Sequence, residues 1–174
     1  LGLGYEALRK INPGLVYCAI SGFGQTGPCR NMRSYNIIAQ AMSGTMHVTG
    51  FPDGSPTKCG LTMGDYVAAV YAIGAILAAL HYRDRTGKGQ MVDISMQDCL
   101  FSFLMDWLEI ATIGKMPMRK GNSSPRAIPT NCFKTRDGYI VTGVYSDEQW
   151  QSLCRAMERE DLIGNAKFDT FGAR

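Results

Sequence analysis

The sequence lacks several patterns that would assign it to a familiar class. Its cysteines form no C-x-x-C pair, and its lysines and arginines form no basic run. The first absence argues against a zinc site and the second against nucleic acid as a partner. No apolar run reaches the roughly 20 residues that a membrane-spanning helix needs. The longest run, Tyr66 to Leu80, has about fifteen residues, so we predict a buried helix there and no membrane partner.

The six cysteines are widely spaced and mostly have apolar neighbours, which is typical of buried thiols: Cys18, Cys29, Cys59, Cys99, Cys132 and Cys154. This usage favours a reducing, cytoplasmic location and argues against a metal site. We also expect no tightly bound cofactor. The first residue is Leu1 rather than methionine, and residues 2–11 already have the pattern of a domain interior. We therefore expect an internal fragment of a longer protein.

Of the 174 residues, 45% are hydrophobic, enough for a globular core. The pattern alternates between helix and strand and predicts an α/β fold with a parallel sheet. Helices are expected at Tyr5–Ile11, Ile37–Ser43, from about Asp65 to Arg85, and at Met96–Ile113; strands at Leu15–Ile20 and Gln90–Ser95. The loop Ser21–Pro28 follows the first strand, where ligands gather in open α/β sheets, although a simple tight turn would also account for it.

The composition changes after residue 113. Residues 114–131 are rich in Gly, Pro, Ser, Lys and Arg and have no periodicity, which indicates a linker. Beyond it, strands at Cys132–Thr135 and Tyr139–Val144 flank a turn, and a helix follows at Ser146–Met157. We predict that residues 1–113 belong to a large domain and that residues 132–174 begin a smaller α+β domain.

Several segments together resemble the class III CoA-transferases, the family of formyl-CoA transferase and carnitine CoA-transferase. They follow one another along nearly the whole chain: Leu3-Gly4-Tyr5, Asn12-Pro13, Ser21–Pro28, Tyr35 with Gln40–Gly44, Met63-Gly64-Asp65 with Ile73–Leu80, Arg85–Gln90 and Asp137-Gly138. The resemblance implies a Rossmann-like large domain, a smaller domain, and a homodimer of two interlocked rings. It also implies a complete protein of about twice this length.

The resemblance implies roles for particular residues. Asp65 matches the family's nucleophilic aspartate, and Gly64 precedes it in the matching motif. Arg33 falls where the family carries a basic residue near CoA, and Gln25 and Tyr35 are candidate contacts at the substrate edge. Lys120-Gly121-Asn122-Ser123 falls where some members place a glycine-rich lid, but the segment departs from the glycine-only form, so a plain linker is an equal alternative.

The implied activity is the transfer of CoA from an acyl-CoA donor to a small carboxylic acid, with the CoA thioester as substrate. Covalent catalysis by a carboxylate, through anhydride and aspartyl-CoA thioester intermediates, suits this exchange. One alternative is an α-methylacyl-CoA racemase, which needs two bases; where that subfamily has a histidine this chain has Tyr35, and Lys134 falls close to the position of its downstream acid. Another is a noncatalytic CoA-binding subunit that kept the fold.

Overall fold

The structure, a computed structural model, describes residues 2–114, 118–124 and 127–174. Its contacts divide the chain into two compact units. The first comprises Leu1–Gly50 and Gly54–Arg119, and the second comprises Phe51–Asp53 and Lys120–Arg174. The division into large domain, linker and small domain at residues 113 and 131 stays a prediction.

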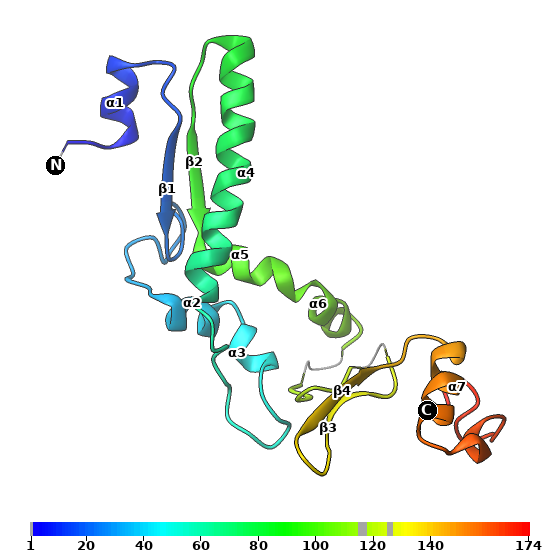
Figure 1. Cartoon of the computed structure of the whole chain (residues 1–174). Coiled ribbons are helices and arrows are strands. Elements are labelled where there is room, and N and C mark those ends of the chain that lie inside the picture. The colour runs from blue at the N-terminus through cyan, green and yellow to red at the C-terminus, as the bar shows by residue number, and fades with distance from the viewer. Residues whose placement is uncertain (1, 115–117, 125–126) are drawn as a thin grey trace. The chain divides into compact units, whose positions relative to one another are not determined.

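The first unit is an α/β structure with a parallel strand pair (Figure 1). β1 runs beside β2 in the register Tyr17↔Met91 to Ser21↔Ser95, so both strands end at the same edge. This confirms the predicted fold class and both predicted strands. The elements are α1 (Tyr5–Ile11), β1 (Tyr17–Ser21), α2 (Asn36–Met42), α3 (Thr45–Val48), α4 (Met63–Thr86), β2 (Met91–Ser95), α5 (Met96–Phe101), η1 (Ser102–Leu104) and α6 (Met105–Thr112).

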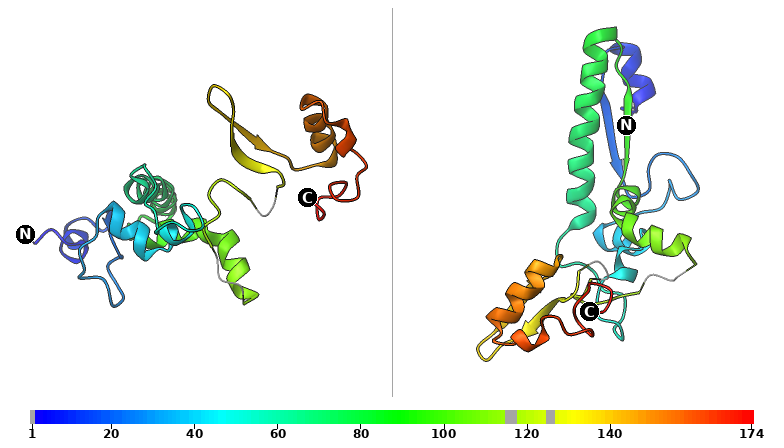
Figure 2. Two further views of the ribbon diagram at one scale, coloured as in Figure 1. Left: turned by 90° about the horizontal axis from the view of Figure 1, so that it is seen from below. Right: turned by 90° about the vertical axis from the view of Figure 1, so that its right-hand side faces the viewer.

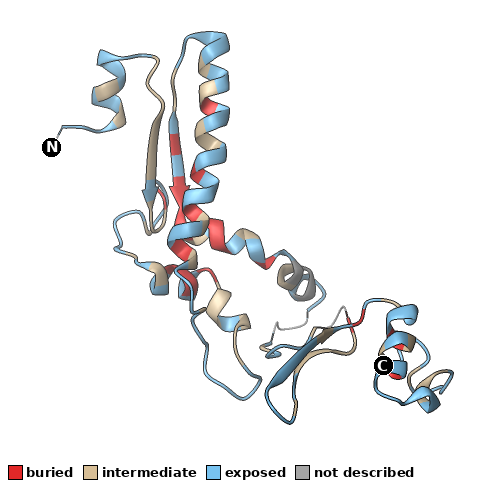
Figure 3. Cartoon of the chain, in the orientation of Figure 1, coloured by how far each residue is buried: buried red, intermediate tan, exposed pale blue. Residues whose placement is uncertain are grey.

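Helix α4 lies alongside the strand pair (Figure 2) and buries only one side, which corrects the prediction of a buried helix. Its buried residues are small: Gly64, Ala68, Ala72 and Ala79. They pack with residues of β2 and α5 in one core, coloured red in Figure 3: Val92, Ile94, Met96, Cys99 and Leu100. Small side chains let the helix approach the strands closely. The larger side chains on its other faces are exposed: Tyr66, Val70, Ile73 and Leu77.

The length of α4 also corrects the sequence argument about membranes. The apolar run belongs to a helix of 24 residues, and by length and composition alone that helix could cross a bilayer. Core helices of soluble proteins meet the same criterion, and the alanine stripe of α4 packs on protein. Length therefore does not exclude a membrane, and the absence of a membrane partner stays a prediction.

The second long helix predicted at Met96–Ile113 is broken in the structure. α5 ends at Phe101, the 3-10 turn η1 follows, and α6 begins at Met105. At the break, the Ser102 hydroxyl donates to the carbonyl oxygen of Cys99 at 2.7 Å and lies 2.7 Å from the hydroxyl of Tyr71. Serine hydroxyls that bond back to the preceding turn bend helices. Hydrophobic periodicity alone does not reveal such a bend.

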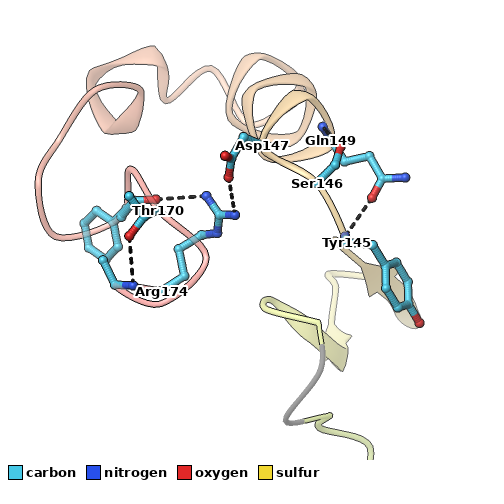
Figure 4. Close-up of polar contacts among 8 residues, drawn as sticks. Tyr145, Ser146, Asp147, Gln149, Thr170 and Arg174 are labelled. Atoms are coloured by element: carbon cyan, nitrogen blue, oxygen red, sulfur yellow. Dashed lines mark hydrogen bonds and ion pairs between the residues drawn. The ribbon is translucent and has the colours of Figure 1, made fainter.

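The second unit contains the predicted hairpin and helix. β3 (Thr130–Lys134) pairs antiparallel with β4 (Tyr139–Gly143), and α7 (Asp147–Ala156) and η2 (Glu160–Leu162) follow. The Ser146 side chain caps α7 by accepting a hydrogen bond from the Gln149 backbone N–H at 3.2 Å. As Figure 4 shows, Arg174 binds Asp147 of α7 at 2.7 Å. The guanidinium also lies over the ring of Trp150, which is buried.

Candidate active site

Asp65 lies in the first turn of α4 and is exposed to solvent. This confirms its predicted position at a helix start, where the helix dipole and free backbone N–H groups favour negative charge. The N-cap residue, Thr62, makes no side-chain hydrogen bond to the helix. The carboxylate is therefore held at an accessible, electropositive helix end, where it could meet an incoming acyl group.

Gly64 is the buried residue next to Asp65. Its backbone N–H donates to Oδ1 of Asn36 in α2 at 3.0 Å. A Cβ atom at Gly64 would lie 3.0 Å from Cε of Met96, 3.3 Å from Cβ of Ala39 and 3.4 Å from Cα of Asn36. The start of α4 thus packs against the first turn of α2 so closely that only glycine fits without a shift.

Tyr35 is the N-cap residue of α2 and 78% exposed. Because its neighbour Asn36 touches Gly64, the start of α2 brings Tyr35 to the same region as Asp65. Arg33, two residues earlier, is also exposed. The structure therefore places three of the predicted site residues, Arg33, Tyr35 and Gly64, around the two helix starts.

The loop Ser21–Pro28 begins where β1 ends, at the predicted edge of the sheet. The backbone N–H of Gln25 donates to Oδ2 of Asp93 in β2 at 2.8 Å, and its side-chain Nε2 donates to Oγ of Ser21 at 3.4 Å. A Cβ atom at Gly22 would clash with the Ser34 side chain. The loop is therefore tied to β2 and to the segment before α2, which carries Tyr35.

The glycines of this loop have the G-x-G-x-x-G spacing, with Gly22, Gly24 and Gly27 in place. In a dinucleotide-binding fingerprint that spacing leads directly into a helix whose N-terminus faces the pyrophosphate. Here the next helix begins only at Asn36. Because no helix begins directly after the loop, the glycine spacing does not indicate a dinucleotide-binding site here.

A cavity of about 280 Å³ opens at the same edge of the sheet. The residues that line it come from the glycine loop, β2, α4, α5 and η1: Phe23, Gly24, Thr26, Tyr71, Asp93, Ile94, Ser95, Asp98, Cys99 and Ser102. Asp65 is not among them. Burial, and then the nearby charge of Asp98, raise the pKa of the Cys99 thiol, so it stays protonated at neutral pH and is a poor nucleophile.

Gly121 and Asn122, the residues predicted for a lid, lie in the second unit and are exposed. Gly121 has a left-handed φ of 59°, and a Cβ atom there would lie 2.8 Å from the ring of Phe51. The turn thus requires glycine because of its positive φ and the close approach of Phe51. Its role as a lid stays a prediction.

Three side chains that shape this region were not predicted to have a role in the site: Asn36, Gln40 and Asp93. Asn36 and Gln40 stand four residues apart in an otherwise apolar helix, so they share one face of α2. This polar pair in an apolar helix is the sequence feature that could have indicated a role for Asn36 and Gln40. Asp93 is the only charged residue of its strand, which is a weaker indication of a role.

Metal ligands are a further element that a site could contain. Within the described ranges, no group of three or more His, Cys, Asp or Glu side chains is arranged to hold a metal ion. The six cysteines are all free thiols; two are buried and four partly buried.

Fold and site together define an α/β protein with an exposed carboxylate at the start of its long crossover helix and a glycine-rich loop at the carboxyl end of β1. The sequence model of CoA-transferase family III matches residues 1–174, and the chain belongs to this family. It is 43% identical to the succinyl-CoA:mesaconate CoA-transferase of Haloarcula marismortui and 40% identical to the mouse succinyl-CoA:glutarate CoA-transferase.

Each alignment covers 98% of this chain, but only 44% and 39% of those two relatives. A CaiB/BaiF family protein from Brucella suis has a similar crystal structure, with a TM-score of 0.84 and 38% identity. That match covers 99% of this chain and 46% of the solved one. The chain therefore spans about half the length of the proteins it resembles.

Proposed function

We propose that the complete protein transfers CoA from an acyl-CoA donor to a carboxylic acid, with Asp65 as the nucleophile. The observation that carries this proposal is the exposed carboxylate of Asp65 in the first turn of α4, in a chain of CoA-transferase family III. The named relatives, which are CoA-transferases, support the reaction class. The aspartyl mechanism is our inference from the carboxylate's position and from the chemistry of the exchange.

In the first half-reaction, a carboxylate oxygen of Asp65 attacks the thioester carbonyl carbon of the donor. The C–S bond breaks, CoA leaves as a thiolate, and a mixed anhydride forms. The thiolate then attacks the Asp65 carbonyl of this anhydride, which releases the donor acid and leaves an aspartyl-CoA thioester. This route keeps the energy of the thioester on the enzyme.

The second half-reaction repeats these steps in reverse. The acceptor carboxylate attacks the aspartyl thioester and releases CoA thiolate, which gives a second anhydride. The thiolate attacks the acceptor's acyl carbon, so that the new acyl-CoA leaves and the Asp65 carboxylate is restored. Donor and acceptor exchange CoA with no net uptake or release of protons.

Each attack forms a tetrahedral oxyanion that needs hydrogen-bond donors. Backbone N–H groups at the start of α4 or in the glycine loop are suitable, and one such donor is worth about 3 kcal/mol in other acyl-transfer sites. In this proposal Arg33 binds the anionic CoA, and Gln25 and Tyr35 contact the substrate beside Asp65.

We propose small dicarboxylic acids as the substrates, because succinyl-CoA, mesaconate and glutarate appear in the names of the similar transferases. The test is an acyl-exchange assay of the complete polypeptide with succinyl-CoA and a panel of mono- and dicarboxylic acids. We expect turnover with at least one dicarboxylic acid. Absence of exchange with every pair would contradict the function and favour a noncatalytic CoA-binding subunit.

The same preparation separates transfer from racemisation. With Tyr35 in place of a histidine base, a chiral 2-methylacyl-CoA should exchange its α-proton with deuterated water no faster than in buffer. Rapid exchange that persisted in Tyr35→Phe would identify a different base and favour a racemase. Mass spectrometry of the recovered thioester measures the exchange.

The proposal includes a cytoplasmic homodimer. The exposed apolar side chains of α4 support association, since contiguous apolar patches of more than a few hundred Å² are rare on soluble monomers. Sedimentation of the complete polypeptide should give a dimer at micromolar concentration. A monodisperse, active monomer would contradict the homodimer.

A further inference from the structure

Two side-chain amides of α2 bind the segment that leads into α4. Oδ1 of Asn36 accepts hydrogen bonds from the backbone N–H of Gly64 at 3.0 Å and from Nε2 of Gln40 at 2.8 Å. The same Nε2 donates to the carbonyl oxygen of Leu61 at 3.3 Å, and Oε1 of Gln40 accepts from the backbone N–H of Cys59 at 2.9 Å. We call Asn36 and Gln40 the amide clamp.

The amide clamp replaces a missing local cap. An ordinary N-cap side chain accepts a hydrogen bond from the second or third N–H of its own helix. Thr62 makes no such bond, and Gly64, the second residue of α4, is bound by Asn36 instead. The helix start is thus capped from another helix, 28 positions earlier in the chain.

Burial of Gln40 makes displacement of the Cys59–Gly64 segment energetically costly. Gln40 is fully buried, so its amide would lose much of its hydrogen bonding if the Cys59–Gly64 segment moved. An unsatisfied buried polar group costs about 1–3 kcal/mol. The segment before it, from Phe51 to Lys58, is exposed and rich in turn residues, and makes no contact of this kind with α2 within the described hydrogen bonds. The clamp therefore fixes the backbone just where α4 begins.

We propose that Asn36 and Gln40 are positioning residues that hold the Asp65 carboxylate in its attacking place relative to Tyr35. This inference rests on the proposed function of Asp65. The first turn of α2 carries both the exposed Tyr35 and Asn36, and Asn36 binds the residue next to Asp65. One helical turn therefore sets the distance between the nucleophile and the substrate edge. A misplacement of about 1 Å can cost roughly 100-fold in rate.

The test compares Asn36→Ala, which removes the shared acceptor, with Asn36→Asp, which keeps an oxygen in the same place. In the complete enzyme, Asn36→Ala should lower kcat about 10- to 100-fold and slow the single-turnover labelling of Asp65 by acyl-CoA by the same factor. The KM for acyl-CoA should change less than about threefold, because the clamp is not expected to bind CoA. Asn36→Asp should recover most of kcat.

Ser43→Ala is the matched control. Ser43 is buried at the end of the same helix and its hydroxyl donates to the Gln40 carbonyl oxygen at 3.2 Å, but it does not bind the Cys59–Gly64 segment. It should weaken α2 while leaving kcat within about twofold, since the clamp's side-chain bonds remain. If Asn36→Ala does not accumulate as folded protein, Asn36→Ser replaces it; its shorter side chain should give an intermediate loss of kcat.

The outcomes separate this inference from the proposed function. If native enzyme does not label at Asp65, the function itself is wrong. If native enzyme labels and Asn36→Ala labels at the same rate, only the clamp is wrong. Equal losses of kcat in Asn36→Ala and Ser43→Ala, or no recovery in Asn36→Asp, would assign Asn36 to general stability and overturn its positioning role.

Discussion

Asp65→Asn in the complete enzyme is expected to lower kcat for CoA transfer by more than about 1,000-fold. The amide cannot form the anhydride or the aspartyl thioester, and loss of a covalent nucleophile has effects of this size or larger in other enzymes. The fold should persist. Asp65 is exposed, and an acidic residue in the first turn of a helix contributes less than about 1 kcal/mol through the dipole.

The measurement combines steady-state transfer with trapping of the intermediate. After incubation with acyl-CoA, hydroxylamine should convert the activated Asp65 to a hydroxamate, which peptide mass spectrometry detects in native enzyme and not in Asp65→Asn. Asp84→Asn is the control, because Asp84 is an exposed carboxylate at the other end of the same helix. It should keep transfer within about twofold. Turnover by Asp65→Asn near the native rate would refute the aspartyl mechanism.

Local sequence signals were sufficient for most elements of the fold. Apolar runs bounded by turn residues predicted both parallel strands. The strand predicted at Leu15–Ile20 lies at Tyr17–Ser21 in the structure, and the one predicted at Gln90–Ser95 lies at Met91–Ser95. The helix predicted at Ser146–Met157 is α7, and the Ser146 side chain caps it. These signals succeed because turn and cap chemistry depends on residues that are near one another in sequence.

The packing of α4 could not be predicted in the same way. Between Tyr66 and Leu80 its sequence is apolar on every face, so periodicity does not tell which side is buried. The buried side is the one with small residues, because Ala68, Ala72 and Ala79 allow close approach to β2 and α5. The break at Ser102 was hidden for a related reason. A hydroxyl that bonds to the preceding turn leaves the apolar spacing unchanged.

Prediction of the site had a different limit. The resemblance to a family identified Asp65, and the structure places it at a helix start as expected. Composition and spacing alone would have left it an ordinary first-turn aspartate. The bond from Gly64 to Asn36 joins residues 28 positions apart, so no local pattern could predict it. Only the polar pair Asn36 and Gln40 in an apolar helix indicated that something had to be bound there.

Gly64→Val is expected to damage both stability and catalysis, because Gly64 has no room for a side chain. A Cβ atom would lie 3.0 Å from Cε of Met96 and 3.3 Å from Cβ of Ala39. Alanine requires a small shift of the flexible Met96 tip, whereas the branched valine must push α4 away from α2. We expect Gly64→Val to lower the free energy of unfolding by about 2 kcal/mol. Gly64→Ala should have a smaller effect.

In the Gly64 variants we also expect a large loss of kcat, beyond the effect on the free energy of unfolding. Pushing α4 away from α2 stretches the hydrogen bond from Gly64 to Asn36 and displaces Asp65 from Tyr35, so kcat should drop about 100-fold in Gly64→Val. Gly74→Ala is the matched control in the same helix; nothing lies within 4 Å of a Cβ atom there, so alanine should be neutral or stabilise by up to about 1 kcal/mol.

Met96→Ala supplies the final step of this test. Removing the Met96 tip makes space for the new methyl group, so the double variant Gly64→Ala with Met96→Ala should be more stable than the two single effects predict when added. Chemical denaturation of the four proteins in the cycle gives the coupling free energy, and single-turnover labelling of Asp65 gives its catalytic counterpart. Strict additivity, or native kcat in Gly64→Val, would show that the close contact between α2 and α4 does not set the position of the nucleophile.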